Sequence, residues 1–216
     1  MISAYLFDLD GTLLDTETVW VDATRDYLLS KGHDVSREFC MPIVYGRSWF
    51  DVYDDLVAAF PELDMGLGPM QTELDAFFYE VRARADVRIP GSVALLRRLA
   101  KTAPCCIVSG SPCEHIADAI EMMDAADCIA FYLGASDYPA GKPNPSGFLM
   151  AADRLGARPA DCVVFEDSAV GVAAGKAAGM KVVALALPLH PRQDVAAADL
   201  ILDDLDKFDP RVFDPA

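Results

Sequence analysis

Near the N-terminus, Phe7-Asp8-Leu9-Asp10-Gly11-Thr12-Leu13-Leu14-Asp15 places three carboxylates at the end of an apolar run. The residues that lead into it, Ala4 to Phe7, are apolar and partly aromatic, as in a buried strand. A Gly-Thr pair then breaks the run with a turn. Asp8 therefore falls at the carboxyl end of a strand, where open α/β sheets bind their ligands. Two anions as close as Asp8 and Asp10 repel each other unless a cation joins them, so the stretch predicts a metal site.

A second apolar run also ends in paired carboxylates, because Glu166-Asp167 follows Val163 to Phe165. Two further motifs lie between the acidic pairs. Ser109-Gly110-Ser111 ends another strand-like run with hydroxyls and backbone amides, a combination that suits an anion. Lys142 lies in a loop made rigid by flanking Gly and Pro residues, which favours a fixed position for its charge. The order of the four motifs predicts one site at one edge of a sheet.

Other interpretations of these motifs account for less of the sequence. An isolated D-x-D-G is commonly a turn, and a strand that ends in Ser111 is commonly the start of a helix. An EF-hand calcium loop is excluded because Phe7 and Leu9 are apolar and a strand, not a helix, precedes the aspartates. Serine hydrolysis needs a histidine base, and none of the three histidines stands in an esterase-like context.

The string FDLDGTLLD resembles the first signature of the haloacid dehalogenase superfamily, whose members mostly hydrolyse phosphate esters through an aspartyl-phosphate. The strings IVSGS, GKPNP and VVFEDS resemble the second, third and fourth signatures and follow in the family's order. A helical segment inserted after the first signature resembles the subgroup that contains β-phosphoglucomutase, phosphoglycolate phosphatase and sugar-phosphate phosphatases. The resemblance thus implies a phosphoric monoester hydrolase.

The resemblance also implies roles for individual residues. Asp8 would be the nucleophile, Asp10 the acid and base, and Lys142 a clamp that offsets charge on the nucleophile and the phosphoryl group. Phosphoryl oxygens would be bound by a second set of groups: Ser109, Gly110, Ser111 and Lys142. The cofactor would be Mg2+, which prefers oxygen ligands. Its expected ligands are Asp8, Asp10 through its carbonyl, Glu166 and Asp167.

Hydrophobic periodicity predicts two kinds of segment. After residue 88, strand-like runs alternate with helices, which indicates a parallel, doubly wound sheet. Those strands are expected at Cys105 to Ser109, Ile129 to Leu133, Val163 to Glu166, Val182 to Leu187 and Leu200 to Leu202. Between Thr16 and Val87 the pattern is helical throughout. Helices are expected there at Thr16 to Lys31, Arg37 to Met41, Ser48 to Ala59 and Met70 to Ala85.

We therefore expect an α/β fold with a doubly wound (Rossmann-like) parallel sheet core, formed by residues 1–15 and 88–216. An α-helical cap of residues 16–87 would be inserted into it. The connections at Asp15-Thr16 and at Arg88 to Gly91 would be the hinges. The polar stretch from Asp203 to Ala216 is expected to be a tail that ends in disorder.

The composition limits the possible partners. A formal net charge of -16 argues against nucleic-acid binding, so we expect a small phosphate ester as the partner. No apolar run approaches the roughly 20 residues of a membrane span, and the N-terminus does not read as a secretory signal. The six cysteines form no C-x-x-C pair, which favours reduced thiols over a disulfide framework or a zinc site. We expect a cytoplasmic enzyme, and no pattern specifies its oligomeric state.

Substrate specificity is expected to come from the cap, where the match to the family is thin. It rests on Gly46-Arg47-Ser48, a loop that in relatives contacts the distal part of the substrate. Arg47 is the candidate contact, with a solvated surface arginine as the alternative. Lys31 is the only lysine between Thr16 and Arg88, and its place at a helix end argues against Schiff-base chemistry from the cap.

The choice between a phosphatase and a mutase depends on Trp20. At this spacing β-phosphoglucomutase carries a histidine that helps control its acid and base group, and tryptophan cannot do this. We therefore expect hydrolysis of a small sugar or polyol phosphate, with a sugar phosphomutase as the alternative. A phosphate-receiver signalling domain also combines strand-end aspartates, a hydroxyl and a lysine, but it is about half as long and has no helical insertion.

Overall fold

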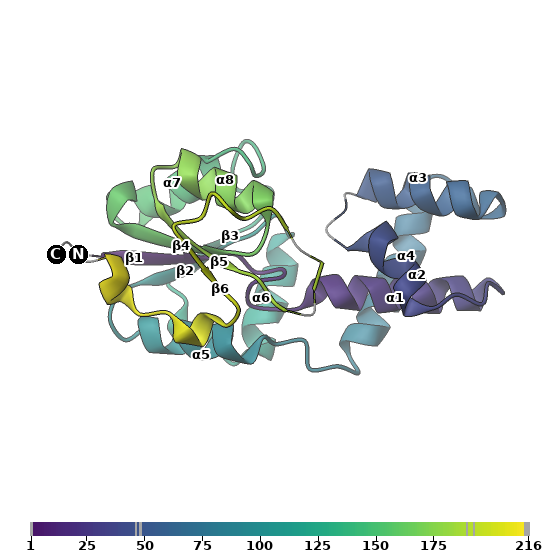
Figure 1. The fold of residues 1–216 in the computed structure, drawn as a ribbon, viewed down its shortest axis with the longest axis horizontal. Helices are drawn as coiled ribbons and strands as arrows, with labels where there is room; N and C mark the ends of the chain where they lie inside the picture. The colour runs from purple at the N-terminus through teal and green to yellow at the C-terminus, as the bar shows by residue number, and fades with distance from the viewer. Residues whose placement is uncertain (1, 46, 48, 189, 192, 214–216) are drawn as a thin grey trace. The chain divides into compact units, whose positions relative to one another are not determined.

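The computed structural model describes residues 2–45, 47, 49–188, 190–191 and 193–213. Its backbone contacts separate two compact units (Figure 1). One unit consists of Met1–Leu14 and Arg88–Ala216, and the other is Asp15–Val87. The first contains every strand that the described residues form, and the second is helical.

The sheet of the first unit has six strands in the order β3-β2-β1-β4-β5-β6, and every neighbouring pair is parallel. The strands are β1 (Ala4–Phe7), β2 (Cys105–Val108), β3 (Phe131–Leu133), β4 (Cys162–Glu166), β5 (Lys181–Leu185) and β6 (Leu200–Leu202). The expected α/β fold with a doubly wound parallel sheet is confirmed. The largest differences from the expected bounds are two residues, since β3 starts two residues later and β5 ends two residues earlier. Strand β2 ends one residue earlier than expected, and β4 and β5 each start one residue earlier.

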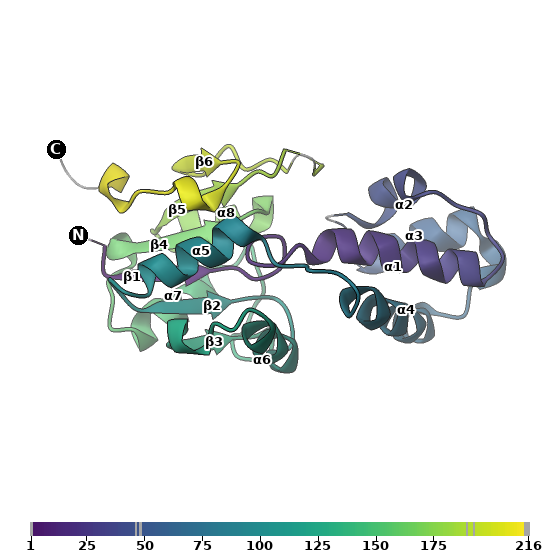
Figure 2. The same ribbon diagram turned by 90° about the horizontal axis from the view of Figure 1, so that it is seen from below.

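Helices cover both faces of this sheet. They are α5 (Pro90–Leu99), α6 (Cys113–Met122), α7 (Ser146–Arg154) and α8 (Ala169–Ala177). Helices α7 and α8 lie on one face, and α5 and α6 lie on the other (Figures 1 and 2). Short 3-10 turns complete the unit: η2 (Ala126–Cys128), η3 (Pro159–Asp161), η4 (Leu205–Lys207) and η5 (Pro210–Phe213). The polar tail expected from Asp203 thus begins as ordered structure, and residues 214–216 lie outside the described residues.

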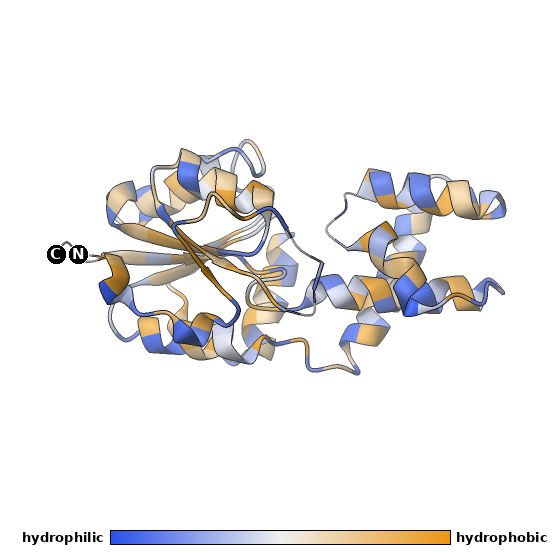
Figure 3. Ribbon diagram, viewed as in Figure 1, coloured by the Kyte–Doolittle hydropathy of each residue, from blue (hydrophilic) through white to orange (hydrophobic). Residues whose placement is uncertain are grey.

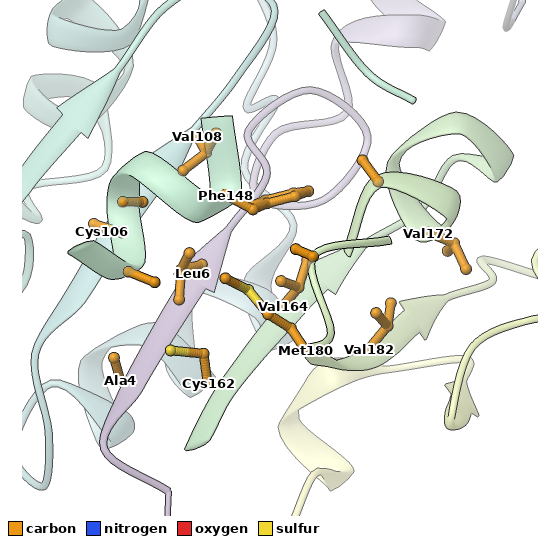
Figure 4. Packing of buried hydrophobic residues seen from close by; sticks show 14 of the residues in the cluster. Ala4, Leu6, Cys106, Val108, Phe148, Cys162, Val164, Val172, Met180 and Val182 are labelled. Atoms are coloured by element: carbon orange, nitrogen blue, oxygen red, sulfur yellow. The ribbon is translucent and has the colours of Figure 1, made fainter. Parts of the chain in front are cut away.

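Each face of the sheet has its own apolar layer, because side chains alternate along every strand. On the side of α7 and α8, Leu6 and Val164 pack with Phe148 and Val172 (Figure 4). On the opposite side the rings of Phe7 and Phe165 stack with centroids 4.5 Å apart. This burial on both faces explains why the strands read as continuous apolar runs (Figure 3).

The position of β1 defines where a ligand can bind. Its neighbours β2 and β4 lie on opposite sides of it, and the helices that follow them cover opposite faces. Such a reversal of strand order opens a crevice at the carboxyl ends of the strands. Phe7 pairs with Phe165 in the register of β1 and β4, so the residues that follow each of them emerge side by side.

The second unit is built from α1 (Thr16–Ser30), α2 (Arg37–Val44), α3 (Trp49–Ala59), η1 (Pro61–Leu63) and α4 (Leu67–Arg82). Its core includes Tyr27, Leu56 and Leu74, all fully buried. The expected bounds of two helices were wrong. Helix α2 continues through Pro42 because Cys40 and Val44 are buried in this core.

Helix α4 begins at Leu67, three residues before its expected start at Met70, and ends at Arg82. Pro69 lies in its first turn, where a backbone N–H has no partner within the helix, so the proline is tolerated there. None of the described helices has the length and apolar character needed to cross a membrane.

The two chain segments that link the units run beside each other. Leu14 and Arg88 form an antiparallel bridge. The Ile89 amide donates to the Leu13 carbonyl at 2.9 Å, and the Asp15 amide donates to the Val87 carbonyl at 2.7 Å. The second connection is shorter than its sequence suggests, because α5 already begins at Pro90.

Candidate active site

The first motif forms a tight loop after β1. The amides of Leu13 and Leu14 both donate to the Leu9 carbonyl, at 2.8 and 3.0 Å, which folds the loop back on itself. The Asp8 amide donates to the Phe165 carbonyl at 2.9 Å and so continues the pairing of β1 with β4. The Asp8 side chain is thereby held at the carboxyl end of the sheet and is only 6% exposed.

Lys142 is the cation that faces Asp8. Its Nζ donates to the Asp8 Oδ1 atom and, at 2.6 Å, to the Glu166 Oε1 atom. Burial raises the pKa of Asp8 from 3.8 to about 8, and the Lys142 charge opposes this shift. Burial alone would lower the pKa of Lys142, but the charges of Asp8 and Glu166 outweigh it and raise that pKa. Lys142 therefore remains a cation at neutral pH.

The Glu166 carboxylate is held by hydrogen bonds from the residues that lead into α8. Its Oε2 atom accepts the amides of Asp167 and Ser168 at 3.0 Å each, and the Ser168 hydroxyl at 2.9 Å. Gly171 leaves the space that the carboxylate fills, since a Cβ atom there would lie 1.7 Å from Glu166 Oε1. This accounts for the E-D-S-x-x-G sequence, in which every named residue contributes to placing one carboxylate.

Asp167 extends the acidic cluster towards the first motif. The Thr12 hydroxyl donates to its Oδ1 atom at 3.1 Å. Gly11 has a φ of 82°, and a Cβ atom there would lie 2.2 Å from Asp167 Oδ2, so only glycine permits this approach. One oxygen each of Asp8, Glu166 and Asp167 lie within 4.8 Å of one another. Lys142 alone cannot neutralise three carboxylates, and their oxygen donors fit a divalent cation.

The second motif lies beside the first and contacts Asp10. The hydroxyls of Ser109 and Ser111 donate to the same oxygen, Asp10 Oδ2, at 3.1 and 2.6 Å. The Ser111 amide in turn donates to the Ser109 hydroxyl at 3.0 Å. Ser111 is not the cap of α6, because Pro112 occupies that position. The structure thus brings together the expected residues of the sheet unit: Asp8, Asp10, Ser109, Gly110, Ser111, Lys142, Glu166 and Asp167.

The cap residues singled out from the sequence lie in the second unit. Arg47 pairs with Asp55 at 3.0 Å and, more distantly, with Asp51 at 4.0 Å. Its neighbours Gly46 and Ser48 fall outside the described residues. Trp20 stacks on Phe78 at 4.0 Å between centroids and meets Trp49 edge-on at 4.8 Å. Trp20 therefore contributes to packing within the cap.

The geometry of the four motifs agrees with a comparison of the whole chain with protein families. The model of the haloacid dehalogenase-like hydrolases matches residues 2–179. The chain belongs to this family. Every motif that carried the resemblance lies within the matched residues.

Individual relatives of this hydrolase are phosphatases. A bifunctional riboflavin kinase/FMN phosphatase from Arabidopsis thaliana is 34% identical over 207 residues, which cover 94% of this chain and 53% of that protein. The chain thus spans about half the length of this relative. Hexitol phosphatase B from Escherichia coli (strain K12) is 31% identical over 195 residues, which cover 87% of this chain and 85% of that protein. The predicted enzyme class, a phosphatase of the haloacid dehalogenase family, is confirmed.

A solved structure supports the fold. The crystal structure of a putative beta-phosphoglucomutase from Thermotoga maritima superposes with a TM-score of 0.82 at 23% identity, over 95% of each chain. At this identity the likeness concerns the fold of the hydrolase alone.

Three residues that shape the site of this hydrolase received no role from the sequence. Thr12 stands inside the first motif, but threonine after glycine reads simply as a turn. Ser168 follows the second acidic pair, where a helix-cap pattern signals only the start of α8. Tyr138 lies between motifs, and no sequence pattern marks it, although its hydroxyl donates to the Ser109 carbonyl at 2.7 Å.

Proposed function

We propose that the enzyme is a Mg2+-dependent phosphatase that hydrolyses a small sugar or polyol phosphate through an aspartyl-phosphate on Asp8. One observation carries the proposal. The buried Asp8 carboxylate contacts the Lys142 ammonium and lies beside two further carboxylates at a sheet edge. Burying the Asp8 and Glu166 carboxylates around one lysine, with the half-buried Asp167 beside them, is costly for stability, and such an arrangement is typical of a catalytic centre.

The proposed reaction has two steps. An oxygen of Asp8 attacks phosphorus, the bond to the alcohol breaks, and Asp10 gives its proton to the leaving oxygen. Asp10 then takes a proton from water, whose oxygen attacks phosphorus and breaks the bond to Asp8. The phosphoryl oxygens would be bound by Ser109, Ser111 and the Gly110 amide, with Lys142 balancing their charge.

Mg2+ would be held by Asp8, Glu166 and Asp167, with the Asp10 carbonyl as a further ligand. Glu166 can participate through Oε1, because that oxygen accepts only the Lys142 donor while Oε2 accepts three. When bound, the ion reduces the repulsion between an anionic nucleophile and an anionic phosphate ester. Thr12 and Gly11 keep Asp167 in place for this purpose.

The substrate class rests on the relatives and on the cap. Hexitol phosphatase B, by its name, acts on hexitol phosphates, which supports a polyol phosphate for this enzyme. A phosphomutase is the second candidate, favoured only by the fold of its structural neighbour. Trp20 argues against it, because its indole packs on Phe78 and Trp49 and offers no acid or base at that position.

Incubation with hexitol phosphates, p-nitrophenyl phosphate and β-glucose 1-phosphate, with and without Mg2+, tests this function. We expect Mg2+-dependent release of inorganic phosphate and loss of release when the metal is chelated. Retained activity in excess EDTA would contradict the metal role. Fast conversion of β-glucose 1-phosphate to glucose 6-phosphate, primed by the 1,6-bisphosphate and with little free phosphate, would show that the enzyme is a mutase.

Arg47 is proposed to bind the distal polar group of the substrate. Arg47→Ala is expected to raise KM for the best hexitol phosphate by about fivefold to fiftyfold with a smaller change in kcat, as for loss of a charged hydrogen bond. Arg84→Ala is the matched control, because Arg84 is an exposed cap arginine that pairs with Glu80. Equal KM values for both variants and wild type would assign Arg47 to the surface pairs with Asp51 and Asp55.

The proposed setting is the cytoplasm, with a small-molecule phosphate ester and no nucleic acid as partner. All six cysteines are free thiols, four of them buried, as suits a reducing compartment. The net charge of -16 disfavours contact with polyanions.

A further inference from the structure

The loop that follows β3 braces the phosphate loop, here defined as Ser109 to Cys113. The Ala135 amide donates to the Ser111 carbonyl at 3.0 Å, and the Tyr138 hydroxyl donates to the Ser109 carbonyl at 2.7 Å. Asp137 accepts the Cys113 thiol at 3.1 Å through the same oxygen that accepts the Gly134 amide at 2.8 Å. Two carbonyls of the phosphate loop, those of Ser109 and Ser111, and the Cys113 side chain are thus held by a single neighbouring segment.

The amides of the phosphate loop differ in their partners. The Ser109 amide donates to the Leu133 carbonyl at 3.1 Å, and the Ser111 amide donates to the Ser109 hydroxyl at 3.0 Å. Among the described residues, the Gly110 amide has no hydrogen-bond partner. Gly110 is also exposed, whereas Ser109 is 1% exposed. Within the phosphate loop, the Gly110 amide is therefore a free backbone donor next to the site.

The direction of that amide depends on Tyr138. A peptide unit is planar and trans, so its carbonyl and its N–H point in opposite directions. Fixing the Ser109 carbonyl oxygen therefore also fixes the Gly110 N–H. Without such a contact the unit would rotate readily, since glycine tolerates backbone conformations on both sides of φ zero.

We propose that Tyr138 is a positioning residue whose hydroxyl locks the Ser109–Gly110 peptide with its N–H directed at a phosphoryl oxygen of the substrate. The inference rests on the proposed function, in which this loop binds the phosphoryl group. It assigns to Tyr138 a role in ground-state and transition-state binding and no contact with the substrate itself.

The surroundings of Tyr138 suit a fixed donor. Its side chain is 7% exposed, and a Cβ atom on Gly147 would lie 3.2 Å from its ring, so the ring is packed closely against α7. Burial raises the pKa of the Tyr138 phenol, which therefore keeps its proton at neutral pH.

Tyr138→Phe tests the lock because it removes one oxygen and keeps the packed ring. We expect the inhibition constant of orthovanadate and the KM of the best substrate to rise by about fivefold, the loss of one ordinary hydrogen bond, with kcat reduced less. Tyr132→Phe is the matched control, since the half-buried Tyr132 in β3 makes none of the phosphate-loop contacts described above. Unchanged constants in Tyr138→Phe would overturn the inference.

A second variant separates peptide orientation from a general loosening of the fold. Gly110→Ala keeps the amide, its added Cβ meets no atom within 4 Å, and its φ lies outside the left-handed region. Because alanine restricts peptide rotation, Gly110→Ala introduced into Tyr138→Phe is expected to restore at least half of the lost vanadate affinity. A double variant that binds vanadate no more tightly than Tyr138→Phe would overturn the inference that Tyr138 fixes this peptide. If the wild-type enzyme is not inhibited by vanadate and releases no phosphate from the tested esters, the proposed function would instead be overturned.

Discussion

Asp8→Asn is expected to lower kcat on every phosphate ester by at least about a thousandfold, because an amide cannot form the acyl-phosphate that divides the reaction into two steps. The measurement is steady-state release of phosphate at saturating Mg2+. Asp153→Asn is the control, since Asp153 is an exposed aspartate on α7, away from the sheet edge. Wild-type turnover in Asp8→Asn would remove Asp8 from the reaction.

The same variant is expected to remain folded, and the pH dependence of its stability checks this. Burial raises the pKa of Asp8 from 3.8 to about 8 in the metal-free protein, so the folded state keeps a proton that the unfolded chain has lost. Between about pH 4 and pH 8 this group destabilises the fold increasingly as pH rises. The neutral amide of the variant carries no such penalty. Measured without metal, Tm of Asp8→Asn should therefore rise relative to wild type across that window.

Asp10→Asn is expected to lower kcat on a hexitol phosphate by about a hundredfold to ten-thousandfold, the usual range for loss of a general acid and base. Its two proposed tasks can be separated with p-nitrophenyl phosphate, whose leaving group needs no proton. With that substrate the first step should survive and the second should fail. Rapid mixing should therefore give a burst of about one p-nitrophenol per enzyme, followed by slow turnover.

An equal loss of activity on both substrates would contradict this assignment. If Asp10→Asn slowed both substrates equally and gave no burst, Asp10 would act on binding or on folding of the first loop. Ser109 and Ser111 share Asp10 Oδ2 in the structure, so a disturbed loop is the main competing explanation. Tm and vanadate affinity of Asp10→Asn distinguish a catalytic role from a disturbed loop. Both quantities would fall if the loop were disturbed.

The sheet and the residues at its edge could be predicted because each rests on a local pattern. Strands buried on both faces appear as short apolar runs, and the carboxylates that end two of them must meet if the strands are parallel neighbours. The place of Lys142 beside Asp8 was also expected, because a lysine in a loop fixed by Gly and Pro residues matches the family's third signature, whereas its contact with Glu166 was not predicted. The family match then confirmed the inference from these motifs.

Other features depend on packing that no local pattern reveals. Helix α2 continues through Pro42 because burial of Cys40 and Val44 outweighs the proline, and the sequence shows only the proline. Ser111 resembles a helix cap, yet its hydroxyl turns to Asp10 because the first and second motifs are brought together only by the sheet. Tyr138 contacts Ser109 across 29 positions of chain, a distance at which residue spacing carries no signal.

In the proposed mechanism Asp8 carries the phosphoryl group during turnover. The most direct measurement is to quench Asp10→Asn with acid during the p-nitrophenol burst, reduce the protein with borohydride and identify the modified residue by peptide mass spectrometry. The expected result is homoserine at position 8, the product of a reduced aspartyl-phosphate. A stable phosphoryl adduct on Ser109 or Ser111, with Asp8 unmodified, would show that a serine and not Asp8 is the nucleophile.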